Sequence, residues 1–122
     1  MKTKILIIDD CASMCKLVSH FLSTDFDCCS ALSAEEGMEK FEAGLFPELV
    51  LLDLNMPGMG GEALLNKMKA DERYKGVKVV IVSAETQSAV KARLINSGAE
   101  DFVSKPFNPE ELLARINRIL QR

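Results

Sequence analysis

Hydrophobic positions along the chain alternate between two spacings, one typical of strands and the other typical of helices. Short runs of consecutive apolar residues, such as 5–8 and 49–52, suit strands that are buried on both faces, as in a parallel sheet. Between such runs apolar residues recur at intervals of three and four, as they do over 14–22. This second spacing predicts amphipathic helices. Strand and helix signals alternate five times.

The limits of most elements can be read from local signals. The predicted strands cover residues 5–8, 28–31, 49–52, 77–82 and 102–103. The predicted helices cover residues 14–22, 33–44, 61–70, 88–97 and 108–120. Ser33 and Glu36 have the form of a capping box, and Gly98 suits the position after a helix. Asn108 followed by Pro109 is a strong start signal. The Glu-rich second helix, with Gly37, has the composition of a solvated face.

Five strand–helix units with short connections predict one α/β domain over residues 1–122. We expect a five-stranded parallel sheet with helices on both faces and right-handed crossovers, a doubly wound three-layer sandwich. Five strands favour the flavodoxin-like order 2-1-3-4-5 over the larger Rossmann order. In this order the first and third strands are neighbours.

Three carboxylates follow these two strands. Asp9 and Asp10 come directly after the first strand, and Asp53 ends the third. Because carboxyl ends of parallel strands meet at one edge of the sheet, the three side chains should share one cleft. Crowded carboxylates repel each other, and a hard divalent cation such as Mg²⁺ relieves this repulsion.

Two further polar residues end the remaining strands of the same edge. Ser83 follows the fourth strand, and Lys105 follows the fifth. Each residue alone has an ordinary structural interpretation, as a turn, a helix cap or an exposed lysine. Together with Asp53 they provide a carboxylate nucleophile, a hydroxyl and a cation. This set suits phosphoryl transfer to an aspartate, in which catalysis is mostly positioning and charge neutralisation.

The sequence resembles the receiver domains of two-component response regulators, and the resemblance extends from Lys4 to about Leu120. The motifs that carry it are Asp9-Asp10, Asp53, Met56-Pro57-Gly58, Ser83-Ala84 and Lys105-Pro106. The resemblance implies that Asp53 accepts a phosphoryl group from a histidine kinase. It also implies a metal site for Mg²⁺, for which Mn²⁺ can substitute. Its ligands would be Asp9, Asp10, Asp53 and the backbone carbonyl of Asn55, with Asp9 acting largely through water.

The resemblance assigns roles to four more side chains. Lys105 would pair with the phosphoryl oxygens, and Ser83 would move to hydrogen-bond them. Phe102 occupies the position of an aromatic residue that changes rotamer with the state of the site, although by default it is a core aromatic. The bond between Lys105 and Pro106 is expected to be cis.

A polar pair beside the acceptor resembles that of chemotaxis-type receivers. Asn55 lies two residues after Asp53, and Glu85 lies two residues after Ser83. Both would flank the path of an attacking water, so we expect a short-lived acyl phosphate.

The leading functional hypothesis is a stand-alone phosphorylation switch. A histidine kinase or a phosphotransfer protein would be the donor, and a downstream protein would bind the face of the fourth helix, fifth strand and fifth helix. This face carries Lys91, Arg93, Arg115 and Arg118. We expect a monomer that acts on no external substrate.

A receiver cut from a longer regulator remains an alternative. An aspartyl-phosphate phosphatase is less favoured, because haloacid-dehalogenase-type enzymes begin with a DxD motif and need room for a substrate cap.

Composition narrows the possible classes further. The net charge of −3 gives no general reason to expect nucleic-acid binding. The apolar run at 5–8 is too short for a signal peptide and ends in two aspartates, and we expect a cytoplasmic protein without membrane insertion. The four cysteines are interpreted as reduced thiols rather than as a zinc site. His20 is interpreted as a surface histidine rather than a phosphodonor.

Two nucleotide-related classes are also disfavoured. The glycines at 58, 60 and 61 form neither of the phosphate-binding glycine motifs. A flavodoxin-like electron carrier would need a phosphate-cradling loop after the first strand, where this chain has two aspartates.

Overall fold

Parallel strands run through the middle of the computed structural model, which describes residues 2–121. The strands are β1 (Thr3–Ile8), β2 (Phe26–Ala31), β3 (Leu49–Leu52), β4 (Lys78–Ser83) and β5 (Asp101–Ser104). The helices are α1 (Ala12–Leu22), α2 (Ala34–Glu42), α3 (Gly61–Ala70), α4 (Ser88–Asn96) and α5 (Pro109–Ile119). Strand and helix alternate strictly along the chain, as the hydrophobic pattern predicts.

The sheet has the order β2-β1-β3-β4-β5, and all of its neighbouring strands are parallel. The predicted flavodoxin-like topology is therefore confirmed. Ile8, the last residue of β1, pairs with Leu52, the last residue of β3. This register brings the residues that follow the two strands side by side at one edge of the sheet.

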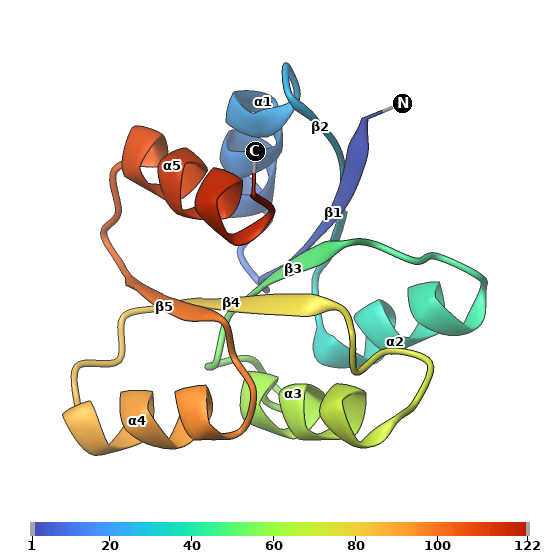
Figure 1. The fold of residues 1–122 in the computed structure, drawn as a ribbon, viewed down its shortest axis with the longest axis vertical. Coiled ribbons are helices and arrows are strands. Elements are labelled where there is room, and N and C mark those ends of the chain that lie inside the picture. The colour runs from blue at the N-terminus through green and yellow to red at the C-terminus, as the bar shows by residue number, and fades with distance from the viewer. Residues whose placement is uncertain (1, 122) are drawn as a thin grey trace.

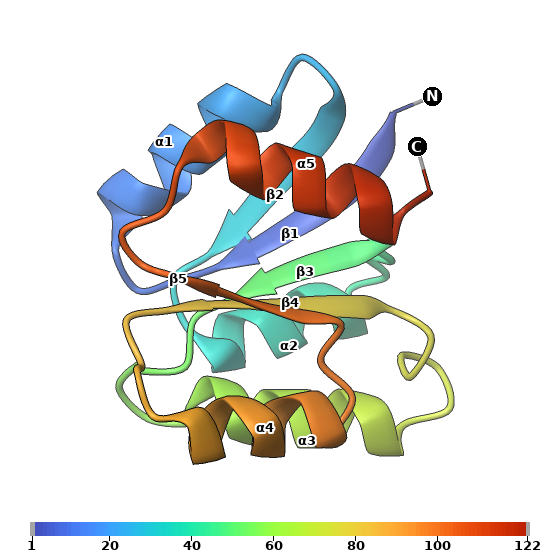
Figure 2. The same cartoon turned by 60° about the vertical axis from the view of Figure 1, so that its left-hand side comes forward.

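Helices cover both faces of the sheet, so the molecule has three layers (Figures 1 and 2). Helices α1 and α5 lie on one face, and α2, α3 and α4 lie on the other. Successive side chains of β1 enter different cores: Ile5 and Ile7 belong to the α1–α5 core, whereas Leu6 and Ile8 belong to the other. This alternation is the two-residue period of a strand that is buried on both sides.

The central strands are the most deeply buried part of the chain. The side chains of 5–8 and 49–52 are all at most 3% exposed. Burying one such aliphatic side chain contributes about 1.5–3 kcal/mol. The two strands that carry the acidic residues are therefore held firmly by their own apolar runs.

The predicted helix caps are present. Ser33 accepts a hydrogen bond from the backbone N–H of Glu36, whose carboxylate accepts in return from the N–H of Leu32. Asn108 caps α5, where Pro109 is the first helical residue. Gly98 follows α4 with a φ of +113°, a left-handed conformation that favours glycine.

Several expectations need correction. Strands β2 and β5 are longer than predicted, because each gains residues that pair with a neighbouring strand. The helical spacing over 14–22 includes Leu17 among the apolar positions of α1, but Leu17 is 60% exposed, and Cys15 occupies a buried position instead. Gly37 is buried rather than solvated, because α2 approaches the sheet so closely that a Cβ at this position would lie 2.7 Å from Cδ1 of Ile8.

The described residues include no helix that is both long and apolar enough to cross a membrane. His20 is exposed near the end of α1, as predicted for a surface histidine.

Candidate functional site

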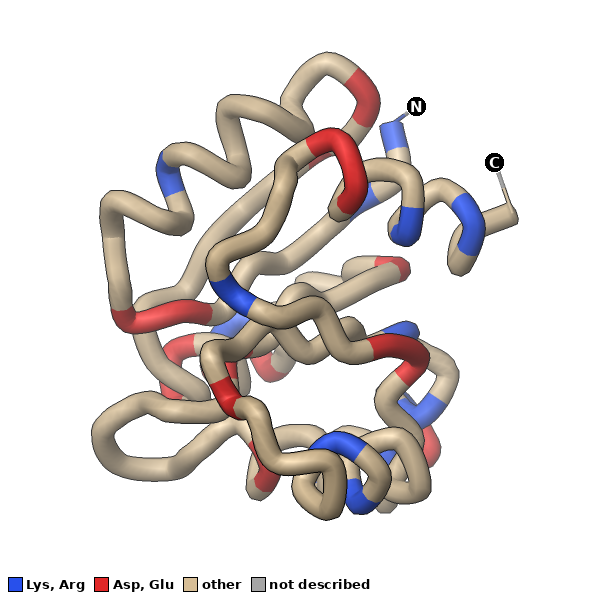
Figure 3. The backbone as a smooth tube through the Cα atoms, turned by 90° about the vertical axis from the view of Figure 1, so that its left-hand side faces the viewer, with Lys and Arg blue, Asp and Glu red and all other residues tan. Residues whose placement is uncertain are grey.

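Three carboxylates meet at the carboxyl edge of the sheet. Ligand oxygens of Asp9, Asp10 and Asp53 lie within 4.8 Å of one another. Asp9 and Asp53 are buried, whereas Asp10 is exposed. Figure 3 shows the consecutive acidic positions where β1 passes into α1. The predicted cleft is therefore formed, and it contains all three predicted acids.

The sheet holds the two buried acids by their backbones. The N–H of Asp53 donates to the carbonyl of Ile8 at 2.9 Å, and the N–H of Asp9 donates to the carbonyl of Ala31 at 3.1 Å. These bonds extend the strand ladders by one residue beyond β1 and β3. The positions of both carboxylates thus follow from strand register rather than from a flexible loop.

Lys105 points into the same cleft from the end of β5. Its ammonium lies 2.9 Å from Oδ2 of Asp9 and 3.8 Å from Oδ2 of Asp53. Its backbone N–H donates to the carbonyl of Ser83 at 2.8 Å, and the bond to Pro106 is cis, as expected. Burial alone would lower the pKa of Lys105, but the hydrogen bond to Asp9 and the charge of Asp53 outweigh burial and raise it. Lys105 is therefore cationic at neutral pH.

Asp53 carries its negative charge in an unfavourable place. Its residue is 7% exposed. Burial raises the pKa of its carboxyl group, and the charge of Asp9 adds to the rise, while Lys105 opposes it. A further cation in the cleft would lower the energy of this carboxylate.

Ser83 and Glu85 lie at the end of β4 and just beyond it. The Ser83 side chain is fully buried, and its hydroxyl oxygen accepts from the N–H of Glu85 at 3.3 Å. The Glu85 carboxylate accepts from the N–H of Gln87 at 3.0 Å, next to the start of α4. Hydrogen bonds of Ser83 and Glu85 therefore hold the loop between β4 and α4.

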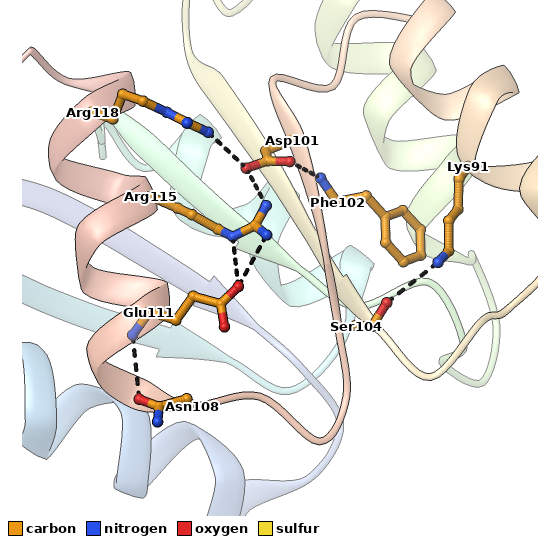
Figure 4. Close-up of polar contacts among 8 residues, drawn as sticks. All are labelled: Lys91, Asp101, Phe102, Ser104, Asn108, Glu111, Arg115 and Arg118. Atoms are coloured by element: carbon orange, nitrogen blue, oxygen red, sulfur yellow. Dashed lines mark hydrogen bonds and ion pairs between the residues drawn. The ribbon is translucent and has the colours of Figure 1, made fainter.

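Phe102 contacts α4 through Lys91. The ammonium of Lys91 lies 5.2 Å from the centre of the Phe102 ring and 3.4 Å from the hydroxyl of Ser104 (Figure 4). A cation over an aromatic face at this distance is attracted to it. Phe102 is half-buried rather than a fully enclosed core residue.

Charged residues connect β5 with α5 on the same side of the molecule. Asp101 lies 2.9 Å from Arg115 and 3.8 Å from Arg118, and Arg115 also pairs with Glu111 (Figure 4). Arg93 belongs to a different pair, because it contacts Glu62 of α3 at 2.7 Å. Of the four predicted basic residues on this face, Arg93 is therefore engaged with α3, outside the network in Figure 4.

Three residues near the cleft were missed by sequence reasoning. The N–H of Cys11 donates to Oδ1 of Asp9 at 2.9 Å, and the thiol of Cys15 donates to the carbonyl of Asp9 at 3.4 Å. Burial raises the pKa of Cys15 to about 11, so this thiol stays protonated. Glu35 contacts the loop after β3. The four-residue spacing of the two cysteines was visible in the sequence, but nothing in it connected Glu35 with that loop.

The donor atoms of the cleft suit Mg²⁺. This cation prefers oxygen ligands, with one or two carboxylates, several waters and a phosphate oxygen. The exposed side of the cleft at Asp10 leaves access for water and for a phosphoryl group. A bound cation would also offset the energetic cost of burying the negative charge of Asp53. The residues present therefore fit the cation that the resemblance implies.

The fold is that of a doubly wound, flavodoxin-like α/β domain, in which three carboxylates and a lysine meet at the switch point of the sheet. Residues 5–117 match the family described as the response regulator receiver domain. The chain therefore belongs to this family and is a receiver domain of a two-component response regulator. Receiver domains bind Mg²⁺ at an acidic pocket and interact with histidine kinases and downstream effectors.

Curated and solved relatives agree with this assignment. The chain is 35% identical over 123 residues to the DNA-binding response regulator MtrA of Mycobacterium tuberculosis (strain ATCC 25618 / H37Rv), covering 100% of this chain and 52% of MtrA. It therefore spans about half the length of this relative. A CheY-like receiver domain protein of Methanospirillum hungatei JF-1 has a TM-score of 0.91 and 30% identity, covering 99% of this chain and 95% of that one. The BeF3-activated DrrB receiver domain, from Thermotoga maritima, has a TM-score of 0.88 and 30% identity with full coverage of both chains.

Proposed function

We propose that this chain is a reversible phosphorylation switch whose acceptor is Asp53. The donor is the phosphohistidine of a histidine kinase or of a phosphotransfer protein. The observation that carries the proposal is the juxtaposition of Asp53 with two other carboxylates and the ammonium of Lys105 in one cleft. The ammonium of Lys105 and a cation held by the carboxylates would both pair with a dianionic phosphoryl group. Neither would pair in this way with an uncharged substrate.

The chemical step is a displacement at phosphorus. A carboxylate oxygen of Asp53 forms a bond to phosphorus while the bond from phosphorus to the histidine nitrogen breaks, and the imidazole leaves with the electron pair and takes up a proton. Hydrolysis reverses the modification, because a water oxygen attacks phosphorus and Asp53 leaves as a carboxylate. Burial raises the pKa of Asp53, and neighbouring cations oppose this rise and favour the ionised form that acts as the nucleophile.

Asp9, Asp10, Asp53 and the backbone carbonyl of Asn55 would hold the divalent cation, Mg²⁺ or Mn²⁺. When bound, the cation supplies charge neutralisation for the carboxylates and for the phosphoryl oxygens. Lys105 would pair with a phosphoryl oxygen. To do so, its ammonium would give up part of its ion pair with Asp9. Electrostatic complementarity of this kind accounts for most catalysis of phosphoryl transfer.

The signal would leave the site through β4 and β5. Ser83 would exchange its hydrogen bond with Glu85 for one to the phosphoryl group, and this exchange would loosen the loop that leads into α4. Phe102 of β5 and its partner Lys91 connect α4, which follows this loop, with β5. Phosphorylation would thereby bias two conformations of the α4–β5–α5 face, to which a downstream protein binds.

Residues 1–122 would act as one stand-alone, monomeric receiver domain that turns over no external substrate and binds no nucleic acid. Its four free thiols suit the reducing cytoplasm. The relatives with DNA-binding regions keep the alternative of a receiver from a longer regulator open.

The test is incubation of the purified protein with Mg²⁺ and acetyl phosphate, followed by intact-mass measurement. A single phosphoryl adduct that is lost after chelation and in Asp53→Asn supports the proposal. Glu39→Gln, at an exposed position of α2, is the control and should form the adduct normally. Continuous release of phosphate from many phosphoesters per protein would instead establish the phosphatase alternative.

A further inference from the structure

One carboxylate outside the acidic cleft reaches the loop that follows Asp53. Glu35 lies in the first turn of α2, and its Oε2 accepts a hydrogen bond from the N–H of Met59 at 2.9 Å. The two residues are 24 positions apart in the chain. The neighbouring Gly58 lies so close that a Cβ at this position would be 2.7 Å from the same oxygen. Glu35 therefore joins α2 to the tip of the β3–α3 loop.

Other contacts of this loop, residues 53–60, are those of its base and of the side chains of Leu54 and Met59, which pack partly buried against the core. At its base the N–H of Gly61 donates to the carbonyl of Leu54 at 3.0 Å, and the side chain of Met56 is buried. Beyond Met56 the chain is exposed at Gly58, which has a φ of +77°. Glycine-containing segments have many conformations available, so restricting them costs free energy. The hydrogen bond from the Met59 N–H to Glu35 of α2 restrains this tip from another element.

We propose that Glu35 is a positioning residue that preorganises the β3–α3 loop, and with it the backbone carbonyl of Asn55, for the divalent cation. The inference rests on the proposed function, because it takes Asn55 as a ligand of that cation. Ordering a loop before binding removes an entropic penalty from the binding step. Glu35 thus acts on the metal site without touching the metal.

The electrostatic setting favours this role. The hydrogen bond from Met59 lowers the pKa of Glu35, so the carboxylate is ionised at neutral pH and accepts a charge-assisted bond. A negative charge in the first turn is also favourable to α2 through the helix dipole. If the Glu35–Met59 hydrogen bond favours cation binding, cation binding must favour this hydrogen bond by the same free energy. Cation binding should therefore strengthen the contact between α2 and the loop.

The test compares Glu35→Ala and Glu35→Gln with wild type, and Glu39→Ala, also on the exposed side of α2, serves as the matched control. Three quantities are measured on the full chain: hydrogen exchange of the Met59 amide without metal, the dissociation constant of Mg²⁺ by NMR titration, and the rate of phosphorylation at saturating Mg²⁺. In Glu35→Ala, Met59 should exchange faster and the Mg²⁺ dissociation constant should rise about three- to tenfold, the range for one hydrogen bond. The rate at saturating Mg²⁺ should stay unchanged.

Glu35→Gln should be intermediate, because its amide oxygen still accepts from Met59 but without the charge. Unchanged Met59 exchange or unchanged Mg²⁺ affinity in Glu35→Ala would overturn the inference, as would an equal loss of affinity in Glu39→Ala. Failure of the proposed function looks different: the wild-type protein itself would then bind no Mg²⁺, while the exchange of Met59 would still respond to Glu35→Ala.

Discussion

Asp53 shows how a single residue can favour function at the expense of stability. The residue is 7% exposed, and it lies beside Asp9 at the end of an apolar strand. The folded state therefore disfavours the charge that phosphoryl transfer requires, and Lys105 compensates only in part. Functional sites commonly hold such unfavourable charges, which ligands then relieve.

The first prediction concerns the stability of the metal-free protein. Because burial raises the folded pKa of Asp53 above its unfolded value of 3.8, the group stabilises the fold below this value, and the contribution is lost as pH rises through the folded pKa. At neutral pH, Asp53→Asn should therefore raise the free energy of unfolding. Urea unfolding at pH 7 without metal measures it, with the exposed Asp27→Asn as control. A clear loss of stability in Asp53→Asn would contradict this account of the charge.

The second prediction concerns the lifetime of the acyl phosphate. Asn55 is exposed beside the acceptor, and Glu85 lies at the same edge of the sheet. With both polar side chains present, hydrolysis should be fast, and Asn55→Met should lengthen the lifetime about tenfold, equivalent to ~1.4 kcal/mol of barrier. The backbone carbonyl of residue 55 is unaffected by this change. Decay of the adduct followed by intact mass measures the lifetime, with the exposed Asn66→Met as control; a wild-type lifetime of hours would refute the prediction.

At the residue scale, the sequence was informative where a side chain directly follows a strand. Asp9, Asp53 and Lys105 could be placed in one cleft, because register and topology determine where the ends of parallel strands meet. Cys15 and Glu35 could not, because their contacts depend on how α1 and α2 pack on the sheet. The burial of Gly37 was missed for the same reason, because the distance between a helix and the sheet depends on tertiary packing.

At the scale of elements, the base of the junction between β3 and α3 is closely packed against the site. Gly61 begins α3, and its N–H bonds back to Leu54. A Cβ on Gly61 would collide with the backbone carbonyl oxygen of Asp53. The helix can approach the acceptor this closely only because the residue has no side chain.

The third prediction follows from this junction. Gly61→Ala should lower the free energy of unfolding by about 2–3 kcal/mol, because backbone must move to admit the methyl group. Gly76→Ala is the matched control, since a Cβ there meets nothing within 4 Å. It should change stability by less than about 0.5 kcal/mol or stabilise slightly through the unfolded state. Denaturant unfolding of both variants checks the prediction, and equal effects at the two positions would contradict it.

Elements were predicted well where burial or a cap gives a sharp signal. Strand β3 and helix α3 begin and end where the sequence pattern places them, because each has an abrupt change from apolar to turn-forming residues. Strands β2 and β5 were shorter in the prediction. Both are edge strands, and β2 contains half-exposed side chains that do not form an apolar run. Pairing with a neighbour, rather than composition, sets their length.

At the scale of the whole molecule, side chains of β5 contact both of the helices that form the α4–β5–α5 face. Lys91 of α4 contacts the Phe102 ring, and Asp101 connects β5 to Arg115 of α5. Contacts made by these two β5 side chains therefore join α4, β5 and α5 into one face. Lys105, whose ammonium lies in the cleft, directly follows β5 in the chain.

The fourth prediction is that modification of the cleft changes this face. With Mg²⁺ and beryllofluoride, the largest amide chemical-shift changes outside the cleft should lie in α4, β5 and the start of α5, including Lys91 and Phe102. Asp53→Asn treated in the same way should show no such changes. Sedimentation of the same samples should give a monomer. Shifts confined to the cleft, or a switch to dimers without shifts in α4, would contradict the proposed route of the signal.

The most direct test of the central claim is to identify the residue that receives the phosphoryl group. The protein is incubated with Mg²⁺ and a phosphorylated histidine kinase or acetyl phosphate, and the acyl phosphate is then reduced with labelled borohydride and mapped by peptide mass spectrometry. The account predicts label at Asp53 alone, dependent on Mg²⁺ and strongly reduced in a Lys105→Ala variant. Label at Asp9 or Asp10 in the wild-type protein, or label on Asp53 that forms equally well after chelation, would contradict it.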